Sequence, residues 1–173
     1  MAFLRSEDET MRIRVSSAND ISGVDALLSL SYPVLLEPDY APSVLVAALP
    51  LISKARPELL TCATYFVAER AGEIVGAGGW TRTRPTGGVE PGLGHIRHVV
   101  TDYRFVRQGI AKGLMTHVLK DAQDAGMQRM ECFSTLTAVP FYAALGFITT
   151  QDVSVPIGLA GIKFPSVLMY LTF

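Results

Sequence analysis

The clearest pattern along the chain lies between residues 107 and 125, where apolar side chains recur every fourth position. These positions are Ile110, Leu114, Val118 and Ala122. Residues four apart share one face of an α-helix, so the run predicts an amphipathic helix that packs against a core. Gly126 follows the run and is typical of a helix C-terminus, because glycine readily adopts the left-handed conformation needed there.

Shorter apolar runs, several of them alternating with polar residues, predict strands on both sides of this helix. The predicted strands are 11–15, 64–69, 73–80, 93–100, 128–133, about 147–154 and about 163–171. Three further helices are expected: one after the capping-box residues Ser17 and Asp20, one from about Pro42, and one at 138–145. Tyr32-Pro33 is expected to end the first of these and Arg56-Pro57 the second. The order predicts a mixed α/β fold with helices on both faces of one sheet.

Composition narrows the classes of protein that fit. The 173 residues carry a formal charge of −1. The chain therefore lacks the excess of cations that is typical of proteins that bind nucleic acid or anionic membranes. The densest apolar stretch, 44–52, is too short for a membrane span and contains Pro50. Residues 1–10 lack the long apolar run of a signal peptide and are expected to form a flexible tail before a single domain at 11–173.

Cysteine usage, histidine spacing and hydropathy add three expectations. Cys62 and Cys132 form no CxxC motif, which fits a reducing compartment, so a cytoplasmic location is expected. His95 and His98 have no third ligand nearby in the sequence, so no metal is expected. The mean hydropathy of +0.31 leaves two interpretations open, a full core or a homodimer contact.

The stretch with the most chemical content is 94–115, where a predicted strand leads through a short loop into the long helix. Gly109 and Ala111 leave the backbone at the start of the helix open to close approach. Helix N-termini offer unpaired N–H groups that bind phosphates, and Arg104, Arg107 and Lys112 surround the same turn. An ordinary amphipathic helix with a glycine near its start explains the spacing equally well.

Three segments together resemble the GNAT superfamily of acetyl-CoA-dependent N-acetyltransferases. Residues 106–111 match the Gly and Gly/Ala positions of its Gln/Arg-x-x-Gly-x-Gly/Ala turn, and 134–147 is similar to its later Phe-Tyr…Gly-Phe motif. The hairpin at 66–80 is typical of the two strands before the cofactor strand. The sequence departs from the family pattern at Val106, where Gln or Arg is usual, and at Thr137, where Asn is common.

The resemblance implies a mostly antiparallel sheet of six to seven strands, splayed in the middle, with acetyl-CoA as acyl donor in the splay. Backbone groups of three strand residues would pair with the pantetheine arm, and the helix turn would bind the diphosphate. The expected cofactor-binding residues are Val99, Val100, Thr101, Arg107, Gln108, Gly109, Ile110, Ala111, Lys112, Thr137 and Tyr142. A backbone N–H near Val99 or Val100 would stabilise the developing oxyanion.

Two catalytic residues follow from the resemblance. Tyr142 occupies the position of a family tyrosine that donates a proton to the leaving sulfur, and a core tyrosine that fills the splay is the alternative. The family often places a base near the start of the cofactor strand, where His95 lies, with Glu90 as the second choice. Strand alternation would put His95, Arg97 and Val99 on one face, with Ile96, His98 and Val100 on the other.

The expected reaction is transfer of an acetyl group to a primary amine of a small molecule or peptide, by direct attack in a ternary complex. The predicted acceptor loops mix acids with bases and so indicate no acceptor charge; they contain Glu37, Asp39, Glu90, Lys54, Arg56, Arg82 and Arg84. An inactive acyl-CoA-binding sensor or regulatory module is the alternative, kept open by Val106 and Thr137. Neither nucleic acid nor a membrane is expected as a partner.

Overall fold

The computed structural model describes residues 10–173 and shows a seven-stranded sheet. The strands are β1 (Arg12–Val15), β2 (Tyr65–Arg70), β3 (Glu73–Thr81), β4 (Leu93–Thr101), β5 (Arg129–Thr135), β6 (Ile148–Ile157) and β7 (Ile162–Thr172). Their order across the sheet is β1-β2-β3-β4-β5-β7-β6, and only β4 and β5 are parallel. The predicted mixed, mostly antiparallel sheet is confirmed.

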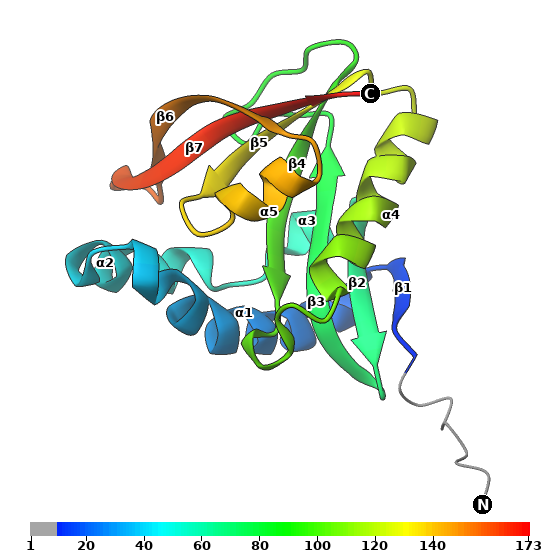
Figure 1. Cartoon of the computed structure of the whole chain (residues 1–173). Coiled ribbons are helices and arrows are strands. Elements are labelled where there is room, and N and C mark those ends of the chain that lie inside the picture. The colour runs from blue at the N-terminus through cyan, green and yellow to red at the C-terminus, as the bar shows by residue number, and fades with distance from the viewer. Residues whose placement is uncertain (1–9) are drawn as a thin grey trace, which may run out of the picture.

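Five α-helices flank the sheet on both faces (Figure 1). They are α1 (Ile21–Leu36), α2 (Pro42–Ile52), α3 (Pro57–Leu60), α4 (Ile110–Asp124) and α5 (Val139–Ala144). One face packs on α1 and α2 through a core that contains Val24, Leu28 and Tyr65. The other packs on α4 through Leu114, Val118 and Met130, which confirms the apolar stripe of the predicted long helix.

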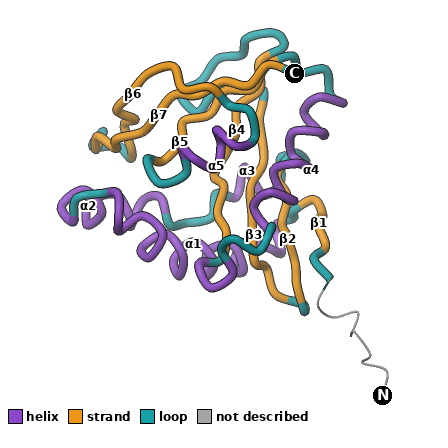
Figure 2. Tube along the Cα trace, viewed as in Figure 1, coloured by secondary structure: helices purple, strands orange, loops and turns teal. Residues whose placement is uncertain are grey.

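The sheet consists of two halves that meet only briefly. Strands β4 and β5 pair over three residues, from Leu93 opposite Arg129 to His95 opposite Glu131. Beyond that point the two strands separate, while β3 stays paired with β4 and β7 with β5. Figure 2 shows the divergence of the two strand groups, with α5 between them. The splay expected from the resemblance is therefore present.

The first helix differs from the prediction. Tyr32-Pro33 was expected to end it, but α1 runs on through Pro33 to Leu36. Proline removes one N–H, which would have bonded the carbonyl four residues earlier, and it does not prevent a further turn. Tyr32 and Leu36 are both buried in the core, so side-chain packing holds the last turn of α1 in place.

Two other expectations concern the N-terminal tail and membrane-spanning helices. The flexible tail predicted at 1–10 lies outside the described residues except for Thr10, and the division of the chain stays a prediction. None of the helices within residues 10–173 combines the length and the apolar character that a bilayer crossing demands.

Candidate active site

A β-bulge interrupts β4 beyond His95, the last residue that pairs with β5. Ala77 pairs with Val100 and Gly79 with Arg97, so the single residue Gly78 faces both His98 and Val99. His98 has a φ of 48°, in the left-handed region that non-glycine residues rarely adopt. The predicted regular alternation of side chains from His95 to Val100 is therefore wrong, because the extra residue re-aims the side chains that follow Arg97.

Two buried tyrosines hold this bulge from the α1 side of the sheet. The hydroxyl of Tyr65 donates to the carbonyl of His98 at 2.7 Å, and that of Tyr32 donates to the carbonyl of Val99 at 3.0 Å. Both carbonyls are thereby fixed by side chains from outside the strand. The bulge is a supported feature of the fold, since each of its displaced carbonyl groups has a partner.

The splay contains a cavity of about 450 Å³. Its wall is formed by α1, α2 and α5, by the two splayed strands β4 and β5, and by the final hairpin of β6 and β7. It includes Tyr32, Ile52, Arg56, Ile96, Arg97, His98, Val99, Cys132, Ser134, Thr135, Tyr142, Pro156, Ile157 and Phe164. This volume is in the range of small-molecule sites, and the wall is mostly apolar with a few polar groups.

His98 has a fixed tautomer in this wall. Its Nε2 lies 2.8 Å from the carbonyl oxygen of Ile52, and because a carbonyl can only accept, Nε2 carries the proton. Burial lowers the pKa of His98, although the bond to Ile52 acts in the opposite direction. The ring is therefore neutral near pH 7, with its lone pair on Nδ1. A neutral imidazole in a cavity wall can accept a proton.

Tyr142 faces the same cavity from α5. It is buried, and burial raises the pKa of its hydroxyl well above the usual value, with the neighbouring Cys132 acting in the same direction. Burial also raises the pKa of the Cys132 thiol, to about 12. The Tyr142 hydroxyl therefore stays protonated at any physiological pH and is available as a donor.

The turn into α4 has the open backbone that the sequence indicates. Gly109 caps the helix with a φ of 83°, and a Cβ built on it would meet no atom within 4 Å. Arg107, two residues earlier, is also left-handed, with a φ of 62°. The first N–H groups of α4 have no partner within the helix, and the space beside Gly109 gives an anionic group access to them.

The family follows from a comparison with known domains. The family model described as an acetyltransferase (GNAT) domain matches residues 53–165, which include β2 to β5 and the whole α4 turn. The chain belongs to the GNAT acetyltransferase family. A search of curated proteins found no match to this sequence.

Solved structures of low sequence identity share the GNAT fold. A GCN5-related N-acetyltransferase from Rhodopseudomonas palustris is 17% identical, with a TM-score of 0.73 over 96% of this chain and 97% of that one. PaiA N-acetyltransferase from Thermoplasma acidophilum, in complex with coenzyme A, is 9% identical, with a TM-score of 0.67 over 95% and 99%. The ribosomal-protein-S18-alanine N-acetyltransferase from Escherichia coli is 13% identical, with a TM-score of 0.63 over 94% of each chain.

His95, the base expected from the sequence, does not line the cavity of this GNAT domain. It is buried, and its Nδ1 lies 3.0 Å from Glu131, whose other carboxylate oxygen accepts from the Tyr170 hydroxyl at 2.6 Å. Burial lowers the pKa of His95, and its Nε2 has no hydrogen-bond partner within the described residues. Glu90 also lies outside the wall, in an ion pair with Arg84 at 2.7 Å.

The remaining predicted residues divide between the strand and the turn. Val99 lines the cavity, and the backbone of 99–101 belongs to the β4 edge that β5 leaves unpaired. Arg107 and Lys112 are exposed at the turn, whereas Arg104 is bound to Asp102 at 2.7 Å. Thr137 has a buried hydroxyl with no partner among residues 10–173, as a polar contact for the pantetheine arm would require.

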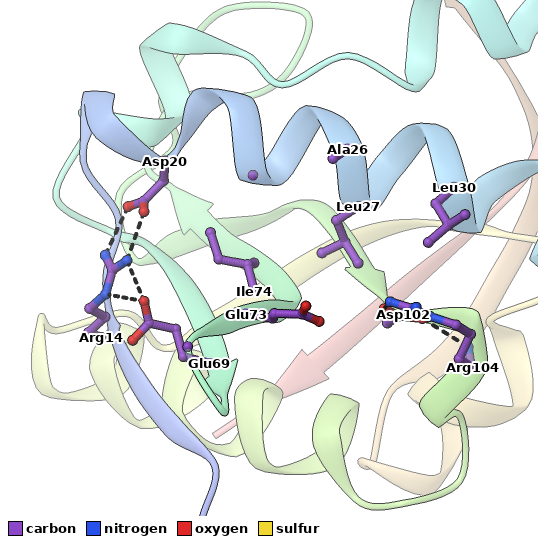
Figure 3. A pocket seen from close by; sticks show the side chains of 12 residues that line it. Arg14, Asp20, Ala26, Leu27, Leu30, Glu69, Glu73, Ile74, Asp102 and Arg104 are labelled. Atoms are coloured by element: carbon purple, nitrogen blue, oxygen red, sulfur yellow. Dashed lines mark hydrogen bonds and ion pairs between the residues drawn. The ribbon is translucent and has the colours of Figure 1, made fainter. Parts of the chain in front are cut away.

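A second hollow, of about 430 Å³, lies between α1 and the β2–β3 hairpin. Figure 3 shows Arg14 held between Asp20 and Glu69, and Arg104 beside Asp102. Hydrogen bonds from these arginines lower the pKa of Asp20 and Asp102. These arginines and carboxylates are already engaged with one another in ion pairs, so the splay cavity is the better candidate for the active site of this GNAT domain.

The sequence indicated Tyr142 and the turn at Gly109, but it did not indicate His98 as a candidate base. The reason is local, because a strict alternation puts His98 on the face opposite Arg97. The bulge removes that alternation, and both residues line one cavity. A bulge depends on the register between β3 and β4, which no single strand sequence reveals.

Proposed function

We propose that this enzyme transfers an acetyl group from acetyl-CoA to a primary amine by direct attack in a ternary complex. The observation that carries the proposal is the cavity in the splay, which has His98 in one wall and Tyr142 in another. A proton acceptor and a protonated hydroxyl thus face the same space. Most of the catalysis would come from positioning, because no covalent enzyme intermediate is needed.

The residues on the donor side fit coenzyme A. The N–H groups of Arg107 to Ala111 would bind the diphosphate beside Gly109, with Arg107 and Lys112 as nearby cations. The unpaired edge of β4 at Val99, Val100 and Thr101 would pair with the pantetheine arm as an added strand. The Thr137 hydroxyl would gain the partner that it lacks within the described chain. The thioester of the bound donor supplies an activated acetyl carbon.

His98 is our choice of base in place of His95. In the proposed reaction the amine loses a proton to Nδ1 of His98 as its nitrogen bonds to the acetyl carbon. The Ile52 carbonyl then stabilises the charged ring through Nε2–H. His95 stands outside the cavity wall and bonds Glu131, so a structural role fits its surroundings better.

Tyr142 and the backbone of β4 complete the reaction. As the bond from carbon to sulfur breaks, the Tyr142 hydroxyl donates its proton to the leaving sulfur. A backbone N–H near Val99 or Val100 would stabilise the charge that develops on the carbonyl oxygen. The acceptor could be a small molecule or a peptide, and the cytoplasmic location and the homodimer stay predictions.

Calorimetric titration of acetyl-CoA into the purified protein tests the donor assignment. Saturable binding that is shared with desulfo-CoA but not with ATP would support it. A panel of amines, with detection of the free thiol, then tests turnover. Binding without any turnover would favour an acyl-CoA-binding sensor, and no binding at millimolar donor would contradict the proposed site.

A further inference from the structure

The charge of the cavity wall indicates what kind of amine it accepts. Among residues 10–173, no aspartate or glutamate contributes to this wall, whereas Arg56 and Arg97 do. Glu58, which is not part of the wall, binds Arg56 at 3.3 Å, and both of these side chains are more than half exposed. A polycationic acceptor such as a polyamine would therefore meet like charges and no anion.

Arg97 is the better placed of the two cations. It is half-buried, and its Nη1 donates to the Thr81 hydroxyl at 3.0 Å. A guanidinium has five N–H donors in a fork, so this one neutral partner leaves most of them unused. Burial lowers the pKa of Arg97, and Arg56 acts in the same direction, so an anion bound here would oppose both effects by favouring the charged guanidinium.

The bulge places this cation beside the base that we propose. Neighbouring residues of a regular strand point to opposite faces, yet Arg97 and His98 both line the cavity because His98 is left-handed. Arg97 lies four residues from Thr101, roughly 13 Å along the strand, and so is separate from the turn that would hold the diphosphate. A carboxylate at Arg97 and an amine at His98 could belong to one small molecule.

Much of the remaining wall is apolar. Leu51, Ile52, Val155, Ile157 and Phe164 contribute to it from α2 and the β6–β7 hairpin. We propose that the acceptor is a small amino acid with an apolar side chain, whose carboxylate binds Arg97. This inference rests on the proposed acetyltransferase activity. Arg56, at the exposed rim, adds attraction for the anion, and the apolar wall receives the side chain.

The test compares L-leucine with two amines that lack its carboxylate, isoamylamine and L-leucinamide. The variants are Arg97→Gln, which keeps a donor for Thr81, Arg97→Lys, which keeps the charge, and Arg12→Gln, which removes an exposed cation from β1 at the far edge of the sheet. Because the three amines differ in pKa, the decisive quantity is the change in the ratio of their kcat/KM values between variants.

We expect Arg97→Gln to lower kcat/KM for leucine by about 10-fold or more, the range for losing hydrogen bonds to a charged group. Because Arg97 also lowers the pKa of His98, its loss affects every amine, so kcat/KM for isoamylamine and leucinamide should fall by clearly less than the value for leucine. Arg97→Lys should recover part of the loss, and Arg12→Gln should match the wild type. An equal effect of Arg97→Gln on all three amines, or wild-type acetylation of spermidine in preference to leucine, would overturn the proposal.

The same compounds separate this proposal from the proposed function. If no amine is acetylated, the enzymatic proposal fails, and calorimetry with the CoA-loaded protein decides the question of the cavity. Binding of leucine that exceeds that of isoamylamine and is lost in Arg97→Gln would still support a carboxylate site. Equal binding of the two compounds, or binding of neither, would overturn it.

Discussion

The proton transfers that we propose depend on individual residues of the cavity wall. His98 is neutral because it is buried, and its bond to Ile52 directs the proton to Nε2. Tyr142 remains protonated for the same physical reason, because burial disfavours the charged form of either group. Burial thus prepares one side chain to accept a proton and the other to donate one.

The two histidines of β4 can be separated by substitution. His98→Asn, which tolerates the left-handed backbone, should lower kcat by about 10²- to 10⁴-fold, the usual contribution of a general base. His95→Asn should reduce stability and leave kcat within a few-fold of the wild type. Steady-state kinetics and thermal unfolding of both variants measure these effects. The reverse pattern would return the role of base to His95.

Loss of the Tyr142 hydroxyl should affect turnover and not donor binding. Tyr142→Phe removes the proton donor, so we expect kcat to fall by about 10²-fold or more while the Kd for acetyl-CoA changes little. Tyr170→Phe is the matched control, because it removes another tyrosine hydroxyl, which donates to Glu131 in a part-buried hydrogen bond away from the cavity. Similar kinetics for the two variants would show that Tyr142 is a core residue only.

At the scale of elements, the turn into α4 and the bulge in β4 depend on backbone conformation. Gly109 requires a positive φ and has open space where a side chain would begin. The sequence indicated this glycine near the helix start, because glycine there is a local signal, although α4 begins at Ile110 and not at the expected Arg107. The bulge has no such local signal, since it arises from the two-to-one pairing of His98 and Val99 with Gly78.

Substitution of Gly109 tests the phosphate turn. Gly109→Val should weaken acetyl-CoA binding by at least about 10-fold, because the side chain would fill the space beside the first N–H groups of α4. Gly126→Val is the control: that glycine follows α4, has a φ of 91° and meets no atom within 4 Å. Both variants should lose similar stability from backbone strain. Equal affinity for acetyl-CoA, measured by calorimetry, would exclude this turn as the site.

The order of the strands and longer helices was predictable, whereas the composition of the cavity wall was not. The short α3 was not predicted, and α2 ends at Ile52 and not at the expected Arg56-Pro57. Local periodicity gave the seven strands and the long helix, because each pattern lies within one element. Arg56 and Arg97 are far apart in the sequence, and among the mixed charges of the loops nothing singled them out. Only the packing of α2, β4 and the final hairpin shows that the wall contains cations and, within residues 10–173, no acid.

For the whole molecule, the buried histidines predict a dependence of stability on pH. Burial lowers the pKa of both His95 and His98, so the unfolded chain binds more protons as the pH falls below about 6.5. Stability should therefore be highest above about pH 7 and should decline as the pH falls from about 7 to about 5. The lowered pKa values of Asp20 and Asp102 act only in more acidic solution, below their ordinary value of 3.8.

Thermal unfolding from pH 8 to pH 5 measures this effect. The Tm of the wild type should fall over that range, and His95→Asn should show a smaller fall because it lacks one of the two titrating groups. A Tm that stays constant or rises toward pH 5 would contradict the assignment of both rings as neutral in the folded state.

Only three residue pairs join β4 to β5, so few backbone hydrogen bonds hold the two half-sheets together. One half-sheet, β1 to β4, carries the proposed base and the phosphate turn, and the other, β5 to β7, carries much of the opposite wall. If the pantetheine arm paired with the open edge of β4, it would add contacts between two half-sheets that share only three residue pairs. Binding of the cofactor would then be linked to the cooperativity of unfolding. The free energy of binding would add to the free energy that is needed to separate the two half-sheets.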